Sequence, residues 1–265
     1  MQNPKGDQDR GADALREALR VVDIETRAMH RAVERLGDEF EAAVRLLFDC
    51  RGRIVVCGSG KSGLVGRKIA STFASTGSPA LFLHPADGGH GDLGVVVRGD
   101  VALLISYSGE NEELIRILPG LKKIGIPIVA LCGHSASTLS RSADVSIDIS
   151  VEEEACPNGL APTASTAVTM GLGDALAIVL LKRRGFRTED FALLHPGGSI
   201  GRRLLTRVSD VMHREDDAAR VRGGSTMQQA LVEMTAKGLG AVCVVDERGR
   251  LIGLLTDGDL RRSLE

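Results

Sequence analysis

Aromatic residues are scarce in this chain: they make up 3% of its 265 residues, with no tryptophan and one tyrosine. The core must therefore consist of aliphatic side chains, which are available because hydrophobic residues amount to 43% of the chain. A hydrophobic share of this size excludes a chain that is disordered throughout. The 32 glycines exceed the usual share of roughly 7% and predict many tight loops.

A surplus of positive charge is also missing. Lysine and arginine total 33 against 35 aspartate and glutamate residues, which gives a formal net charge of −2 at pH 7. Proteins that bind nucleic acid use a basic surplus to neutralise phosphate backbones, so we expect no nucleic-acid partner. A small anionic substrate is still compatible with this balance, because a single pocket can be locally positive.

Three further absences bear on location. The five cysteines form no CxxC pair, and three of them lie in or near apolar runs, which indicates reduced, buried thiols. Residues 1–13, MQNPKGDQDRGAD, are polar and unlike a signal peptide. No run reaches the roughly 18 apolar residues of a membrane span. We therefore expect a cytoplasmic protein with no membrane partner.

An apolar stripe with spacings of three and four residues is the first positive feature. It predicts an amphipathic helical region over about 12–50, broken into two helices near Gly37 and Asp38, with Thr26 at its one polar position. The stripe fits packing against a partner subunit and packing on the chain's own sheet equally well. Its members are Leu15, Leu19, Val22, Met29, Val33, Leu36, Phe40, Val44 and Leu47.

Short apolar runs then alternate with helical stretches, which predicts a doubly wound, five-stranded parallel α/β sheet covered on both faces. Ligands of such sheets bind beyond the carboxyl ends of the strands, where the polar loops 58–63, 106–113 and 150–166 fall. The predicted strands are Ile54–Cys57, Ala80–Leu83, Val101–Ser106, Ile128–Leu131 and Val145–Ile149, and the predicted helices are Leu64–Ser75, Glu112–Ile124, Leu139–Ser142 and about Thr166–Arg184.

The C-terminal part has a different pattern. A charged, glycine-containing linker over about 206–225 precedes a predicted helix at Met227–Lys237 and predicted strands at Ala241–Val245 and Leu251–Leu255. This is a small β-α-β-β unit that buries little surface alone, so we expect it to need a companion.

The loop GSGKSG, residues 58–63, suits a phosphate. Its glycines allow close backbone approach, Ser59 and Ser62 offer hydroxyl groups, and the following helix N-terminus favours an anion. It is not a P-loop, because Val55 stands where the leading glycine is required. It is not a secure dinucleotide fingerprint either, because Leu81 and Phe82 stand where an acidic residue is expected. The alternative is a tight turn that binds nothing.

The other two loops carry hydroxyl and carboxyl groups. SYSGENEE places Ser106 and Ser108 at a strand end, and VEEEACPNGLAPTASTA places the acidic run 152–154 before Thr163 and Ser165 at a helix start. Acidic residues at a helix start also have an explanation in the helix dipole. For two of the three glutamates in 152–154 we expect a solvated acidic turn. His84, His90 and His195 lie in loops beside glycine and proline, and each is a functional candidate.

Taken in order, several strings resemble the sugar isomerase (SIS) domain of D-arabinose 5-phosphate isomerases, over about residues 15–212. The tail TDGDLRR resembles the end of a cystathionine-β-synthase (CBS) motif, which those isomerases also carry. The strings are GSGKSGLVGRKIASTFASTGSPALFLHP, HGDLG, SYSGENEEL, EACPNGLAPTASTA, GDALAI and RGFRTEDFALLHPGGSIGRRLL.

The resemblance implies a division into a SIS domain, 1–205, and a linker with a single CBS motif, 206–265, where the family commonly has two. It implicates four residues in catalysis: Lys61, Glu113, Glu154 and His195. It implies substrate contacts from the loops and their neighbours: Ser59, Ser62, Gly77, Ser78, His90, Ser106, Ser108, Thr163 and Ser165. His84 matches a position that binds an inhibitory zinc ion in the family.

The family interconverts D-arabinose 5-phosphate and D-ribulose 5-phosphate through a cis-enediol, in the pathway to the Kdo sugar of lipopolysaccharide or capsules. We expect Glu154 to be the C–H base, with Glu113 or His195 as the alternatives and His195 reaching in from a neighbouring subunit. Lys61 would stabilise the enediolate or the phosphate. No cofactor is required by this scheme.

Two departures from the family pattern bear on substrate choice, and several points stay open. Asp87 stands where a glutamate is usual, and Tyr107 replaces an asparagine. Other sugar phosphates and a non-catalytic sugar-phosphate sensor are the alternative functions. The resemblance implies a homotetramer. The CBS unit is expected either to bind a nucleotide or pathway product or, slightly favoured, to serve assembly.

Overall fold

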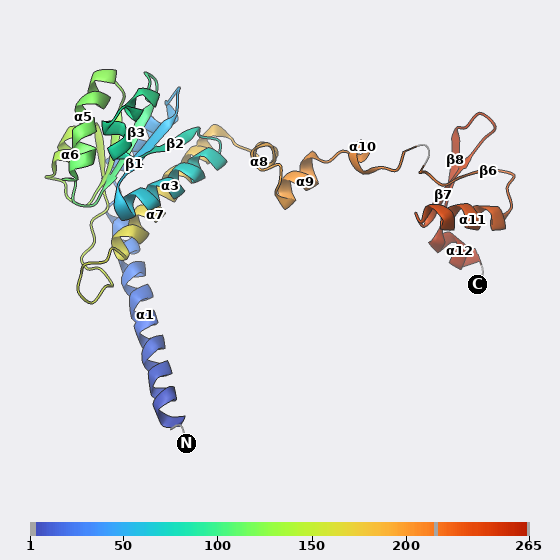
Figure 1. Cartoon of the computed structure of the whole chain (residues 1–265), viewed down its shortest axis with the longest axis horizontal. Helices are drawn as coiled ribbons and strands as arrows, with labels where there is room; N and C mark the ends of the chain where they lie inside the picture. The colour runs from blue at the N-terminus through green and yellow to red at the C-terminus, as the bar shows by residue number, and fades with distance from the viewer. Residues whose placement is uncertain (1–3, 215–216, 264–265) are drawn as a thin grey trace. The chain divides into compact units, whose positions relative to one another are not determined.

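The computed structural model describes residues 4–214 and 217–263. The chain forms two compact units, Met1–Arg202 and Arg203–Glu265 (Figure 1). The domain boundary expected after residue 205 stays a prediction.

A five-stranded parallel sheet is the centre of the N-terminal unit, in the order β2-β1-β3-β4-β5. All five predicted strands are confirmed, with ends that differ by at most one residue. The strands are β1 (Ile54–Gly58), β2 (Ala80–Leu83), β3 (Val101–Ser106), β4 (Ile128–Cys132) and β5 (Val145–Asp148).

The strands are apolar throughout because both faces of the sheet are covered. Along β1, Ile54 and Val56 face one hydrophobic core, while Val55 and Cys57 face the other. Helices α1, α2, α3 and α7 supply the first core, and α5 with the short α6 supplies the second. The N-terminal unit is therefore a three-layer α/β/α arrangement, as predicted.

The predicted helices of this unit are confirmed in position, but α1, α3 and α7 begin about eight, four and two residues earlier than expected, and α4, η1, α8 and α9 were not predicted. The helices are α1 (Pro4–Glu34), α2 (Asp38–Phe48), α3 (Gly60–Ser75), α4 (Pro85–Gly89), the 3-10 helix η1 (Asp92–Val95), α5 (Glu112–Ile124), α6 (Thr138–Ser142), α7 (Ala164–Arg184) and α8 (Thr188–Leu194), followed by α9 (Ser199–Leu205).

The predicted break between the first two helices is confirmed, but the buried face of α1 is not the predicted one. Ile24, Ala28 and Ala32 are buried, because small alanines let α1 approach α7 closely. The stripe of larger residues faces away: Leu19 is 63% exposed and Val22 is 60% exposed. Over the N-terminal half of the stripe, the expectation of packing on the chain's own sheet is therefore wrong.

Helix α7 is apolar along most of its length. By length and composition alone this helix is sufficient to cross a membrane, a test that the core helix of a globular domain also passes. Half of the apolar segment is buried within the protein, and Val168, Leu172 and Leu176 lie in the core beneath the sheet. Its hydrophobicity is that of a core helix.

The C-terminal unit contains the predicted helix and both predicted strands, together with a strand, β6, that lies inside the expected linker. Strand β6 pairs parallel with β7, and β7 pairs antiparallel with β8. Its buried core is small: Ala219, Ala230, Met234, Val242 and Leu260. The elements are α10 (Val208–Val211), β6 (Arg220–Arg222), α11 (Met227–Lys237), β7 (Ala241–Val245), β8 (Leu251–Thr256) and α12 (Asp257–Ser263).

Candidate active site

The first loop lies where the chain reverses its direction of winding, between β1 and β3. Gly58 at the end of β1 pairs with Ile105, so the loops after these two strands are neighbours at the topological switch point. A Cβ on Gly63 would come within 2.6 Å of the Gly58 carbonyl oxygen, so only glycine allows the turn. Ser59 precedes α3, and the exposed Lys61 lies in its first turn.

The second loop is held by its own serines. The buried Ser106 hydroxyl accepts a hydrogen bond from the Gly109 N–H at 3.1 Å, and the Ser108 hydroxyl accepts one from the Glu110 N–H at 3.3 Å. Gly109 has φ +67°, and a side chain there would overlap Ser137. Because both hydroxyl oxygens already accept, their protons are left to donate to an anion.

Glu113 is half-buried in the first turn of α5. Burial raises the pKa of the Cys57 thiol to about 12, and the negative charge of Glu113 adds to this rise. Cys57 lies in β1 directly before Gly58, the first residue of the first loop. The catalytic role expected for Glu113 stays a prediction.

Glu154 lies in the third loop, ten residues before α7 begins, and its carboxylate contacts residues at the start of that helix. One carboxylate oxygen, Oε2, accepts hydrogen bonds from the Thr163 N–H (2.7 Å), the Thr163 hydroxyl (3.0 Å) and the Ser165 N–H (3.3 Å). Burial raises the pKa of Glu154, but hydrogen bonds from Ser165 and Thr163 outweigh it, so the pKa lies below its ordinary value. Thr163 and Ser165, expected to contact substrate, therefore have Glu154 as their partner.

Tyr107 connects the second and third loops. Its hydroxyl donates to the Val151 carbonyl at 3.4 Å and accepts from the Val151 N–H at 3.2 Å. Its ring lies edge-on to His134, with centroids 5.6 Å apart. Tyr107, which departs from the family pattern, thus connects the second loop to the third by hydrogen bonds. The spacing of residues in the sequence could not predict this role.

A cavity of about 500 Å³ opens beside the first loop. Lys61, Arg67 and His84 line it, with no acidic residue among the lining groups. The Nδ1 atom of His84 accepts a hydrogen bond from the Ala86 N–H at 3.3 Å. The other polar atom of the ring is Nε2. The Arg67 guanidinium lies 4.3 Å above the Phe82 ring. The sequence analysis missed Arg67, which lies nearly two helical turns after Lys61.

Two predicted substrate contacts lie at the other edge of the sheet, before β2. The Ser78 N–H donates a hydrogen bond to the Phe73 carbonyl oxygen. The Ser78 hydroxyl accepts a hydrogen bond from Arg184 Nε at 3.2 Å. A side chain at Gly77 would overlap the Phe186 ring. The structure does not bring these residues to the loops. His90 follows α4 and is exposed, beyond the carboxyl end of β2.

His195 also lies away from the loops. It follows α8, whose residues Leu193 and Leu194 line a cleft with Arg53 and Ala80 at the amino ends of β1 and β2, so α8 lies at the far edge of the sheet (Figure 1). The His195 ring stacks on Phe191 with centroids 4.0 Å apart. Within one chain the structure therefore does not join His195 to Glu154.

No group of three or more His, Cys, Asp or Glu side chains is placed to hold a metal ion within residues 4–214 and 217–263. A protein zinc site uses three or four such ligands. Within the described residues His84 belongs to no such group, and the inhibitory zinc ion expected there stays a prediction.

Two family matches define the class of protein. The SIS domain family matches residues 46–179, and the CBS domain family matches residues 208–265. The parallel sheet with its hydroxyl-rich loops is thus that of a SIS domain, and the C-terminal unit is that of a CBS domain.

The particular family follows from full-length relatives. Arabinose 5-phosphate isomerase KdsD of Pseudomonas aeruginosa is 50% identical over 253 residues, covering 96% of this chain and 78% of that protein. Its namesake in Escherichia coli (strain K12) is 46% identical over 252 residues, covering 95% and 77%. The chain belongs to the arabinose 5-phosphate isomerase family.

A solved structure agrees with this assignment. A protein of E. coli CFT073 in complex with arabinose 5-phosphate superposes with a TM-score of 0.68 at 39% identity, covering 70% of this chain and 98% of that one.

Proposed function

We propose that this protein interconverts D-arabinose 5-phosphate and D-ribulose 5-phosphate. The observation that carries the proposal is the pair of serine loops that follow the neighbouring strands β1 and β3 at the switch point, in a chain 46–50% identical to arabinose 5-phosphate isomerases. The family name places the reaction in the pathway to Kdo, and a cytoplasmic setting goes with that pathway.

The phosphate binds at the first two loops. Ser59 and Ser62 lie at the start of α3, where backbone N–H groups and the helix dipole favour an anion. Ser106 and Ser108 donate from the neighbouring loop. Lys61 adds a positive charge beside a cavity that has no acidic lining.

Glu154 moves the proton between the two carbons. Its lowered pKa keeps it ionised at neutral pH, as a base must be. The carboxylate takes the proton from C2 of the open-chain aldose and returns it to C1, while a proton moves between O1 and O2. Lys61 stabilises the enediolate, and Glu113 orients the sugar hydroxyls. The reaction is balanced within the sugar, so no redox cofactor takes part.

His195 assists ring opening or proton transfer at oxygen from a second copy of the chain. The observation that supports this is that α8 lines a cleft at the amino ends of β1 and β2, at the opposite end of its own sheet from the loops. The exposed stripe on α1, with Leu15, Leu19 and Val22, provides surface for the homotetramer that the family resemblance implies.

The C-terminal unit serves assembly by pairing with the same unit of another copy. Its buried core is small, and Leu251, Ile252 and Leu254 on β8 are exposed. A cleft of about 490 Å³ lined by Arg222, Ser225 and other residues would be the place for a nucleotide or pathway product. An inhibitory zinc ion at His84 would need ligands from outside the described side chains.

The test is turnover of D-arabinose 5-phosphate in the presence of EDTA, alongside ribose 5-phosphate, glucose 6-phosphate and glucosamine 6-phosphate. We expect selective, EDTA-resistant conversion of the arabinose compound. Binding without turnover would instead make the protein a sugar-phosphate sensor, and turnover of another sugar would make it an isomerase of different specificity.

A further inference from the structure

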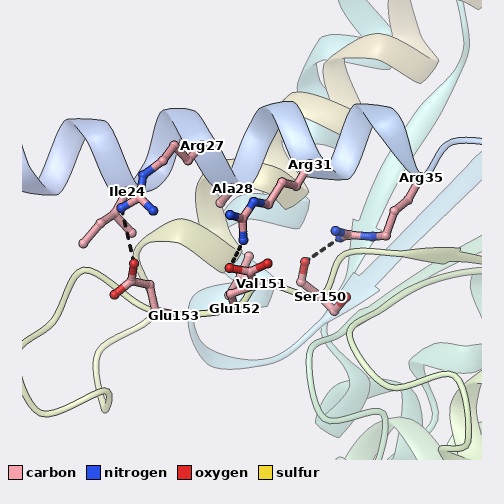
Figure 2. A pocket seen from close by; sticks show the side chains of 9 residues that line it. All are labelled: Ile24, Arg27, Ala28, Arg31, Arg35, Ser150, Val151, Glu152 and Glu153. Carbon is pink, nitrogen blue, oxygen red and sulfur yellow. Dashed lines mark hydrogen bonds and ion pairs between the residues drawn. The ribbon is translucent and has the colours of Figure 1, made fainter.

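The segment that carries Glu154 has no regular structure of its own. Between the end of β5 at Asp148 and the start of α7 at Ala164 the chain forms neither helix nor strand. A base must hold its position to within a fraction of an ångström to be effective, so something outside this segment must fix it. The neighbouring element is α1 (Figure 2).

Three arginines on one face of α1 and the arginine that directly follows the helix reach this segment. They follow each other at seven, four and four residues, which places them along one side of a helix. We call them the arginine ladder: Arg20, Arg27, Arg31 and Arg35.

Arg31 and Arg35, at the C-terminal end of the ladder, contact the beginning of the segment. Arg35 donates to the Asp148 carboxylate at 2.8 Å and to the Ser150 carbonyl at 2.6 Å. Arg31 pairs with Glu152. Glu152, expected to be simply solvated, thus has a partner. The space left between helix and segment is about 20 Å³, room for roughly one water molecule, so the two elements are in contact.

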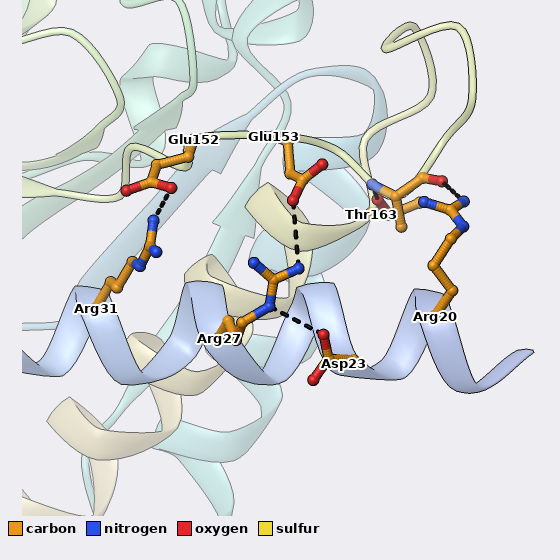
Figure 3. Close-up of polar contacts among 8 residues, drawn as sticks. Arg20, Asp23, Arg27, Arg31, Glu152, Glu153 and Thr163 are labelled. Atoms are coloured by element: carbon orange, nitrogen blue, oxygen red, sulfur yellow. Dashed lines mark hydrogen bonds and ion pairs between the residues drawn. The ribbon is translucent and has the colours of Figure 1, made fainter.

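Arg20 and Arg27, at the N-terminal end of the ladder, contact the two residues that flank Glu154 in the sequence. Arg27 pairs with Glu153 at 3.3 Å, and Arg20 donates to the Ala155 carbonyl at 2.5 Å (Figure 3). Both neighbours of Glu154 are therefore tied to α1, while Glu154 points to Thr163 and Ser165. Arg27 is in turn braced by Asp23 at 2.9 Å.

We propose that the arginine ladder of α1 positions the Glu154 carboxylate for the proposed isomerisation. The helix is then a positioning element of the active site, and the ladder residues act through the loop without touching the substrate. This inference rests on the proposed function. Single exposed ion pairs contribute little, but several on one segment act as a network.

The test removes the two bracketing contacts from the helix side. In the full-length variant Arg20→Gln/Arg27→Gln, we expect kcat for D-arabinose 5-phosphate to fall by about tenfold or more, with KM changed by less than about threefold, because the phosphate loops are untouched. The matched control is Arg183→Gln, which removes an ion pair of similar exposure between α7 and Glu41 of α2. The control should keep its kcat.

A charge reversal separates positioning from general stability. In an Asp23→Asn background, where no second carboxylate faces position 27, Arg27→Glu places a negative charge opposite Glu153 and should lower kcat. In the same background, Arg27→Glu/Glu153→Arg should recover most of it at unchanged thermal midpoint. An unaltered kcat in the double glutamine variant, or no recovery in the reversed pair, would overturn the proposal. If Arg20→Gln/Arg27→Gln does not fold, the recovery of kcat in the reversed pair is the test of the positioning role.

A readout independent of turnover keeps this inference distinct from the proposed function. Hydrogen–deuterium exchange over residues 149–162 should rise in Arg20→Gln/Arg27→Gln and stay at the wild-type level in Arg183→Gln. If the wild type converts no D-arabinose 5-phosphate, the proposed function fails, while the exchange result still shows whether the ladder holds the segment. Unchanged exchange would refute the positioning role.

Discussion

Glu154 is a carboxylate whose environment favours the charged form. Three hydrogen bonds converge on Oε2, and they outweigh the burial that would raise its pKa. Because the pKa in the folded state is depressed, these bonds stabilise the fold at pH values above the ordinary glutamate pKa. That contribution is lost as the pH falls through the lower, folded-state pKa.

The Thr163 hydroxyl gives a direct test of this balance. Replacing Thr163 with valine removes one donor to the carboxylate, so the pKa of Glu154 should rise. The acid limb of the pH profile of kcat/KM should then move to higher pH, since that profile reports the free enzyme.

Thr166→Val is the control for this shift. It removes a hydroxyl that donates to the Thr163 carbonyl at 2.8 Å and does not touch Glu154. The assignment of Glu154 as the base fails if the acid limb stays in place in Thr163→Val, or if both variants move it equally.

At the scale of elements, the crossing of α3 and α7 depends on a glycine. A Cβ on Gly173 would come within 2.6 Å of Ile69 Cγ1, a branched side chain that is fully buried on α3. We expect Gly173→Ala to lower the free energy of unfolding by about 1–3 kcal/mol through overpacking. Urea unfolding followed by circular dichroism measures it.

A second glycine of the same helix is the matched control. At Gly171 an added Cβ would meet only the end of the flexible Met29 side chain, which can move aside. The helix preference for alanine over glycine, about 0.5–1 kcal/mol, then offsets the contact, so Gly171→Ala should be nearly neutral. Equal destabilisation by the two substitutions would contradict a tight crossing at Gly173.

The elements that sequence alone predicts are those with a continuous or periodic apolar pattern. The five strands and α5 were placed to within a residue because both faces of the sheet are buried. Strand β6 was missed because Arg220–Arg222 is short and charged. The face of α1 was misjudged because Ala28 and Ala32 carry little weight in a pattern of large apolar residues, although their small size is what permits close packing.

The candidate site shows a similar division. The loops after β1, β3 and β5 were predictable from polar residues at strand ends. The arginine ladder was not, because its partners lie more than a hundred residues away, and the charges alone resemble a solvated helix face. Nor could sequence place Gly77 and Ser78, whose partners Phe186 and Arg184 lie equally far along the chain.

At the scale of the whole molecule, α1 has two faces with different proposed roles. One carries the arginine ladder, and the exposed stripe lies about half a turn around the helix, given roughly 100° per residue. An oligomer that covers Leu19 and Val22 would bury apolar surface worth about 25 cal/mol per Å². It would also hold α1 still, which links assembly to the position of Glu154.

The separation of His195 from Glu154 predicts that the proposed site is shared between two chains, and mixing variants tests this. Glu154→Gln removes the base and His195→Ala removes the assisting group, so each variant alone should lose most activity, by about 10²–10⁴-fold for the base. If each site combines Glu154 of one chain with His195 of another, chains co-expressed in equal amounts restore about a quarter of the sites in a symmetric oligomer.

Purification on two different tags selects the mixed oligomers, and separately purified variants combined without exchange are the control. Recovered turnover in the mixed species alone would establish that neighbouring chains complete each other's sites. Persistent inactivity in verified mixed oligomers would mean that His195 works within its own chain. In that case α8 would have to leave the cleft at Arg53 and Ala80 and cross to the other end of the sheet.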